Sequence, residues 1–278
     1  MNLFQILNDI EKVDPEVYDK LDNRRSVMKQ FAKISGKLAL AAVPIAFGGM
    51  FKKAYGQGTT AVVDTLQFAL TLEYLEAAFY VKAVSTAGLI PAGAPTAAIT
   101  TIRDHETAHV NFLKTAITSL GATPVTSPTF DFSGGNGSNN GPFKTVFSDY
   151  GLFLAVAQTF EDTGVRAYKG QAGNLISNND VLTAALNIHS VEARHAAHIR
   201  SMRKAAGAAV KPWITLNDTG GIGTAVAASY AGEELTTQAT INIVNINGMS
   251  ISANAASEAF DEDLSKAAVL AIVDPFIA

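Results

Sequence analysis

The feature of this sequence that most restricts its fold is a set of carboxylates inside apolar helical segments. The stretch LTLEYLEAAFY contains two acids, and acids interrupt three later segments of the same kind. A carboxylate is costly to bury unless a cation compensates its charge. The chain therefore has to fold so that these acids meet around a shared positive charge. They are Glu73, Glu76, Glu106, Glu161 and Glu192.

Most of these acids belong to two copies of one motif. In each copy a Glu is followed seven positions later by a Tyr and then, at a nearly equal distance along the chain in both copies, by a Glu-x-x-His. At about 100° per residue, seven positions return a side chain to nearly the same helix face. The repeat indicates two equivalent helix pairs. The copies are Glu73, Tyr80, Glu106 and His109, and then Glu161, Tyr168, Glu192 and His195.

The Glu-x-x-His spacing places both side chains on one side of a helix. Three positions make almost one turn, so the Glu and the His can reach the same central cavity. Two single Glu, two shared Glu and two His would give two adjacent metal ions a mixed oxygen and nitrogen shell. One imidazole per ion favours iron or manganese over a thiolate zinc site, and the chain has no Cys.

Periodic apolar residues and Gly or Pro boundaries predict four long helices. The connection at 121–147 is rich in Gly and long enough to cross a bundle lengthwise. The other connections are short. One long crossover predicts an all-α four-helix bundle in which helices 2 and 3 run parallel. The predicted helices are 60–86, 96–120, 148–171, and one capped by a residue of 178–180 that runs to 206.

With these motifs, residues 59–207 resemble the ferritin-like superfamily of di-iron and di-manganese carboxylate proteins, which includes ferritins, bacterioferritins, rubrerythrins and manganese catalases. The resemblance implies a ferritin-like bundle and two iron or two manganese ions as cofactor. The implied metal ligands are Glu73 and Glu161, one to each ion, the bridging Glu106 and Glu192, and the imidazoles of His109 and His195.

Four further residues leave alternatives open. Glu76 is an alternative ligand or an acid beside the ligands, and His189 is an additional candidate for which we favour a hydrogen-bonding role. Tyr80 and Tyr168 either bond to the bridging carboxylates, relay electrons, or are simply packed aromatics.

Other polar residues of these helices are expected outside the cavity. His105 and His198 point about 100–120° away from the Glu of their helices, which predicts surface or interhelix positions. Most of the helix arginines are expected in solvent. These are Arg103, Arg194, Arg200 and Arg203.

The N-terminal segment, 1–56, resembles a twin-arginine export signal. Arg24 and Arg25 precede an apolar run at 38–51, and Ala54-Tyr55-Gly56 forms a small-residue cleavage site. The run is shorter than the roughly 20 residues that span a bilayer. A retained amphipathic anchor is the alternative. The signal implies a periplasmic or cell-envelope location and export machinery as a partner.

The chain is therefore predicted to comprise an export signal (1–56), a bundle (57–207) and an extension packed on the bundle (208–278). In the extension, β-branched residues at 240–246 and 249–253 flank Asn247-Gly248, which predicts a small β-hairpin. Acids at 261–263 are expected to cap a short helix that ends near 273.

Together these features predict an exported dinuclear metal protein that reacts with peroxide or dioxygen by ferroxidase, peroxidase or catalase-like chemistry, in oxidative stress or metal handling. The net charge of −4 argues against a nucleic-acid partner. The C-terminal tail is more similar to that of exported ferritin-like proteins, a group that includes desiccation-related proteins, than to that of cage-forming ferritins. The alternative is a structural or stress-protective envelope protein with a vestigial or stabilising metal site. Enzymatic activity, the choice of metal and a homo-oligomer stay open.

We predict that the signal is removed after Gly56, so that Gln57 is the first residue of the exported protein. Replacing Arg24 and Arg25 together by Lys should block export, because the twin-arginine pair is the recognised feature. Mass spectrometry of envelope fractions measures both outcomes. An intact Met1 on envelope material would contradict cleavage and support the anchor.

Overall fold

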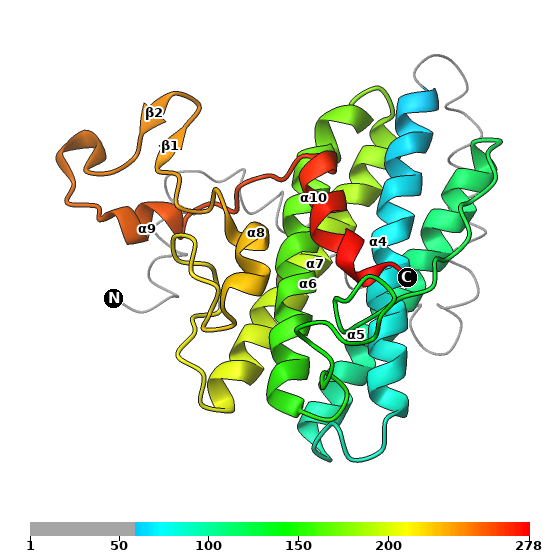
Figure 1. Cartoon of the computed structure of the whole chain (residues 1–278). Helices are drawn as coiled ribbons and strands as arrows, with labels where there is room; N and C mark the ends of the chain where they lie inside the picture. Colours follow the sequence, from blue (N-terminus) through cyan, green and yellow to red (C-terminus); the bar gives the residue numbers. More distant parts are fainter. Residues whose placement is uncertain (1–58) are drawn as a thin grey trace, which may run out of the picture. The chain divides into compact units, whose positions relative to one another are not determined.

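The computed structural model describes residues 59–278, so the predicted signal and its cleavage site lie outside the described residues. Four long helices form the bundle (Figure 1), and this confirms the predicted all-α fold. No helix in the described part of the chain combines the length and apolar character needed to cross a membrane. The bundle helices are α4 (Thr59–Ser85), α5 (Ala94–Ser119), α6 (Tyr150–Gln171) and α7 (Asn179–Ala205).

The helix ends follow local sequence signals. The side chain of Asp149 caps α6 by accepting from the N–H of Leu152, and Asn178 caps α7 by accepting from the N–H of Val181. Pro95 stands in the first turn of α5, where its missing N–H costs nothing. Gly121 follows α5 with φ +81°, a conformation open to glycine without strain.

The direction of the helices is visible in two tyrosine contacts between α4 and α6. Tyr80 bonds to Glu161, whereas the earlier Glu73 bonds to the later Tyr168, so α4 and α6 are antiparallel. Since α4 and α5 form an antiparallel hairpin with a short link, α5 and α6 run parallel. The long connection between them makes the predicted crossover.

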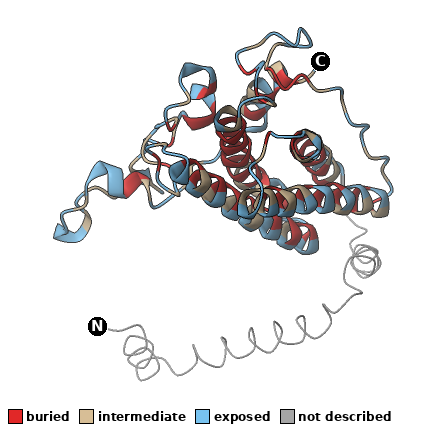
Figure 2. Cartoon of the chain, turned by 90° about the horizontal axis from the view of Figure 1, so that it is seen from below, coloured by how far each residue is buried: buried red, intermediate tan, exposed pale blue. Residues whose placement is uncertain are grey.

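Helix α6 is the most deeply enclosed element of the bundle. Every residue from 153 to 168 is buried. A helix buried all round must be covered on all sides, and α6 packs against α4 and α7 and also against α8 (Ala227–Tyr230) and α10 (Lys266–Val273). Figure 2 shows the buried residues gathered on the faces that the helices turn toward one another.

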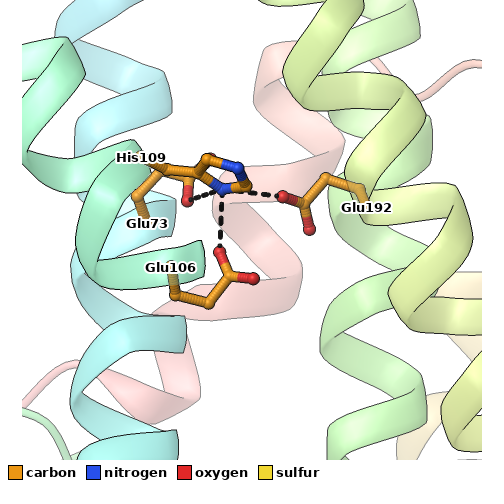
Figure 3. Close-up of side chains that lie close together, drawn as sticks. All are labelled: Glu73, Glu106, His109 and Glu192. Carbon is orange, nitrogen blue, oxygen red and sulfur yellow. Dashed lines mark hydrogen bonds and ion pairs between the residues drawn. The ribbon is translucent and has the colours of Figure 1, made fainter. Parts of the chain in front are cut away.

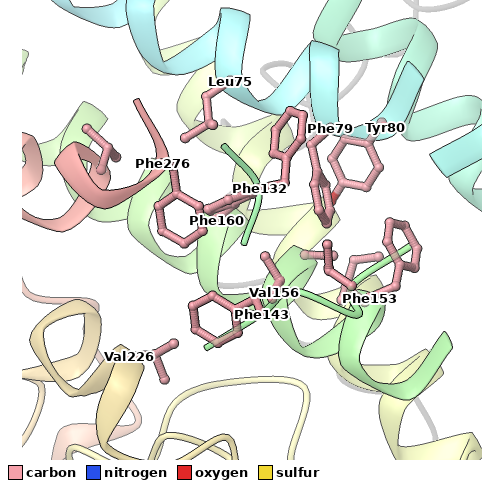
Figure 4. Close-up of a cluster of buried hydrophobic side chains, with 14 of the residues drawn as sticks. Leu75, Phe79, Tyr80, Phe132, Phe143, Phe153, Val156, Phe160, Val226 and Phe276 are labelled. Carbon is pink, nitrogen blue, oxygen red and sulfur yellow. The ribbon is translucent and has the colours of Figure 1, made fainter. Parts of the chain in front are cut away.

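Aromatic side chains tie the crossover and the extension to the bundle (Figure 4). The ring of Phe79 in α4 lies 5.5 Å from that of Phe132 in the crossover and 5.1 Å from that of Phe160 in α6. Phe160 in turn meets Phe276 at 4.9 Å. Such pairs contribute about 1 kcal/mol each beyond area burial. This cluster therefore fixes α4, the crossover, α6 and the segment after α10 to one another.

The small hairpin of the extension is present, but it precedes the Asn247-Gly248 turn that the sequence predicts. Strand β1 (Thr237–Gln238) pairs antiparallel with β2 (Ile241–Asn242). The turn between them places Ala239 and Thr240 at positive φ. The stretch after β2 is largely exposed, so its β-branched residues have no apolar surface to cover and form no longer ladder. Asn247-Gly248 instead ends a 3₁₀ turn, and α9 (Ala253–Ser257) follows.

Helix α10 is held at both ends. It ends at Val273 as predicted, but Ser265, not the acids at 261–263, caps it by accepting from the N–H of Ala268. Before the helix, the N–H of Leu264 donates to the carbonyl of Arg166. After it, the N–H of Asp131 in the crossover donates to the carbonyl of Phe276 at 2.8 Å.

Two of the four arginines expected in solvent, Arg200 and Arg203, are instead buried, whereas Arg194 is exposed as expected. Arg200 pairs with Asp162 at 2.6 Å, and both side chains are buried. Arg203 donates to the side-chain oxygen of Gln158 at 2.6 Å. The buried Arg166 pairs with Glu233 of the extension at 2.7 Å. A buried charge is stable only when it is paired. The partners of these arginines belong to α6 and to the extension that covers it.

Candidate metal centre

Two groups of acids and histidines lie at the middle of the bundle. Within each group, every residue offers one ligand atom, and these atoms all lie within 4.8 Å of one another. The groups have Glu106 and Glu192 in common. All members are buried. The first group is Glu73, Glu106, His109 and Glu192, and the second is Glu106, Glu161, Glu192 and His195.

All four helices contribute to this centre. Helices α5 and α7 each supply a Glu and, one turn later, a His, while α4 and α6 each supply one Glu. Figure 3 shows the first group converging from three of the helices. The Nδ1 atom of His109 lies 3.1 Å from a carboxylate oxygen of each of Glu73, Glu106 and Glu192.

His195 occupies the matching position in the second group. Its Nδ1 atom lies 2.8 Å from Glu106 Oε1 and 3.3 Å from Glu161 Oε2. Its Nε2 atom lies 2.9 Å from Nδ1 of His105. This contact leaves Nδ1 as the nitrogen that faces the acids, and a partner at the far nitrogen orients a ligating imidazole.

Several polar atoms of this centre lack a well-aligned hydrogen-bond partner, as is expected of atoms that bind a metal. Among residues 59–278, six buried side-chain atoms make no well-aligned hydrogen bond, and five of them lie here, although His195 Nδ1 is close to two of the acids. Buried polar atoms without partners are rare and need an explanation. A cation between the acids would supply it. These five atoms are Glu106 Oε1, Glu161 Oε2, both carboxylate oxygens of Glu192, and His195 Nδ1.

The two tyrosines of the motif bond to the single acids and not to the shared ones. The hydroxyl of Tyr80 donates to Glu161, and that of Tyr168 donates to Glu73. Burial and the neighbouring carboxylate raise the pKa of both tyrosines well above the usual range. Both hydroxyls therefore stay protonated and act as donors. One contact runs from α4 to α6 and the other from α6 to α4, so the two are reciprocal.

The charges of the centre are strongly coupled. Burial, followed by the charges of Glu106 and Glu73, raises the pKa of Glu192 well above its ordinary value, and burial raises the pKa of Glu106 to about 7. Burial alone would lower the pKa of His195, but the negative charges of the nearby Glu161 and Glu106 outweigh it and raise that pKa to about 11. In the metal-free protein the imidazolium groups therefore supply the positive charge.

The other candidate residues lie outside both groups. Glu76 is buried beside the two groups, and its burial, followed by the charge of Glu192, raises its pKa well above the ordinary value. His189 donates from Nδ1 to the carbonyl of Val165 at 3.0 Å and so braces α7 against α6. This is a hydrogen bond, but to the backbone of α6 and not to one of the proposed ligands.

The two histidines expected outside the cavity differ in what they contact. His198 is exposed, as predicted. His105 is also largely exposed and contacts another helix, which fits the predicted surface or interhelix position, but its partner, His195, was not predicted. Spacing along one helix carries no signal for a contact between two helices, so sequence reasoning alone had no means of finding it.

The fold and the site define a four-helix bundle protein with a candidate dinuclear carboxylate and histidine centre. The family model described as a ferritin-like domain matches residues 61–205, which is more than half of the chain. The chain belongs to this ferritin-like domain family. A comparison with curated proteins found no match.

We predict that the shared and single acids differ in their effect on metal content. Glu106→Gln and Glu192→Gln should each reduce bound metal from about two equivalents to less than one, because each removes an oxygen from both groups. Glu73→Gln and Glu161→Gln should each leave about one equivalent. Equilibrium dialysis with Mn²⁺ followed by elemental analysis measures this, with the exposed His198→Gln as control. Two equivalents in all four variants would contradict the assignment.

We also predict that metal affinity falls as pH is lowered. A ligating imidazole must lose its proton, and the pKa of His195 lies at about 11 in the metal-free protein. At neutral pH, binding therefore releases protons, and affinity should fall about tenfold per pH unit for each proton displaced. Calorimetric titrations with Mn²⁺ at neutral and mildly acidic pH, in buffers of different ionisation enthalpy, measure the protons directly. A pH-independent affinity without proton release would contradict protonated ligands.

Proposed function

We propose that this protein is a dinuclear iron or manganese protein that reacts with peroxide or dioxygen. The observation that carries the proposal is the sharing of Glu106 and Glu192 by two adjacent four-residue groups. Sharing of this kind fits two ions held side by side better than it fits one. Glu73 with His109, and Glu161 with His195, would complete the two sets.

The donor chemistry supports these metals. Four carboxylates balance the charge of two divalent ions, and each group has one imidazole among oxygen donors, a set that suits iron or manganese. Two ions held in this way would supply a pair of redox-active centres with positions open to a small ligand.

The chain's own residues keep the centre fixed and dry. Tyr80 and Tyr168 each hold one oxygen of a single acid, which leaves the other oxygen for the cavity. His105 fixes the orientation of His195. The rings of Phe79 and Phe153 pack beside Tyr80 and exclude water from that side. A preorganised, water-poor site strengthens every electrostatic interaction within it.

Among the reactions open to such a centre, we favour disproportionation of peroxide. In this reaction one peroxide is oxidised to dioxygen and another is reduced to water, so no external electron donor is needed. The chain contains no Cys and hence no thiolate iron site that could relay electrons to the centre. We further propose that the protein acts in the cell envelope, on the strength of the Arg24-Arg25 signal.

The test loads the purified protein with Mn²⁺ or Fe²⁺ and follows peroxide loss together with dioxygen release. Catalase-like chemistry predicts half a molecule of dioxygen for each peroxide consumed, and Glu192→Gln should abolish it. Peroxide loss without dioxygen would indicate a peroxidase with an added donor. Full metal content without any reaction with peroxide or dioxygen would contradict the proposal and favour a stabilising site in a stress-protective protein.

A further inference from the structure

A small pocket lies beside the centre, between the bundle and α10. Its walls come from α4, α6 and the end of α10, and its cavity volume is about 10 Å³. A single water molecule needs about this much space. Glu76 stands at its inner wall, and Ile272 and Val273 of α10 stand at its outer wall.

Gly164 makes the connection from this pocket to the centre. It also lines the pocket, and a Cβ placed on it would lie 3.2 Å from Glu76 Oε1 and 3.3 Å from Glu192 Oε2. Glu192 belongs to both groups of the centre. The space that a side chain would fill at position 164 therefore adjoins a shared acid directly, without an intervening apolar layer.

The side of the centre formed by α5 and α7 is occupied by imidazoles. His109 and His195 belong to these helices, and His105 closes the far nitrogen of His195. A second cavity, of about 20 Å³, lies among the four helices, but of the residues of the motif only Tyr168 lines it. Neither cavity is lined by an acid of the two groups, but the pocket under α10 is lined by Gly164, which lies against the shared acid Glu192.

We propose that the pocket under α10 is the route by which peroxide-sized molecules reach the metal centre, with Gly164 as its narrowest point and Ile272 as part of its mouth. This inference rests on the proposed function. The cavity volume limits the route to molecules of a few atoms. Helix α10, held at Leu264 and at Phe276, covers the route from the outside.

The experiment measures how fast a small neutral probe reaches the centre. The purified protein is loaded with Fe²⁺ without oxygen and mixed rapidly with nitric oxide, and the absorbance change gives the binding rate. Ile272→Trp should slow binding at least about tenfold, because a packed interior leaves no bypass around a filled void. Ile272→Ala should speed binding. Leu270→Trp is the matched control, since Leu270 is on the same helix but exposed and outside the pocket.

A second pair of variants tests the inner end of the route. Gly164→Ala should slow nitric oxide binding, whereas Gly173→Ala, where a Cβ would meet nothing within 4 Å, should not. Iron content is measured for every variant so that rates are compared at equal loading.

The outcomes separate the route from the function. Slower binding in Ile272→Trp with an unchanged rate in Leu270→Trp supports the route. Equal rates in both Trp variants and in Ile272→Ala would overturn the route while leaving the metal centre in place. Failure of the unaltered protein to hold either iron or manganese would overturn the proposed function, and the route with it. Iron that is held but does not bind nitric oxide would overturn the route alone.

Discussion

The structure depends on the electrostatic cost of placing four carboxylates within a few ångströms of one another inside an apolar bundle. Within the described part of the chain, the positive groups nearest to Glu106 and Glu192 are the imidazoles of His109 and His195. Burial of this kind is unfavourable without compensation. On the outer side of α6 the buried charges are balanced, because Asp162 and Arg166 each pair with a side chain of opposite charge there. The centre is therefore short of positive charge, which a bound cation would supply.

The two halves of the bundle arrange their acids and tyrosines in the same way. The reciprocal contacts of Tyr80 with Glu161 and Tyr168 with Glu73 relate α4 to α6 by an approximate two-fold exchange. The shared acids belong to α5 and α7, so each of the two groups draws residues from three helices. Neither helix hairpin contains a complete group. Packing of the hairpins and assembly of the centre are therefore one event and not two.

Much of this was predictable from the sequence, for a physical reason. Helix ends depend on residues close in the chain, so α6 begins within two residues of the predicted position 148, and Asn178, one of the three predicted caps, does cap α7. The motif spacings likewise report which side chains share a helix face. Contacts set by the packing of distant elements were missed. The bond of His105 to His195 depends on the register of α5 against α7, and the burial of Arg200 depends on where the extension lies. The β-branched run after Thr240 has a strand-like pattern but no surface to pack on.

The clamp on α10 has a consequence for the order in which the protein is completed. Helix α10 begins at Lys266, well after α7 ends at Ala205, so it leaves the ribosome after every helix that contributes to the centre. The segment that follows it is joined to the crossover, where Asp131 donates to the carbonyl of Phe276. A nascent chain that has formed the bundle but not yet docked α10 leaves Gly164 uncovered. In such a chain, ions would have a wider path to the acids than in the finished fold, and docking of α10 would then enclose any ion already bound.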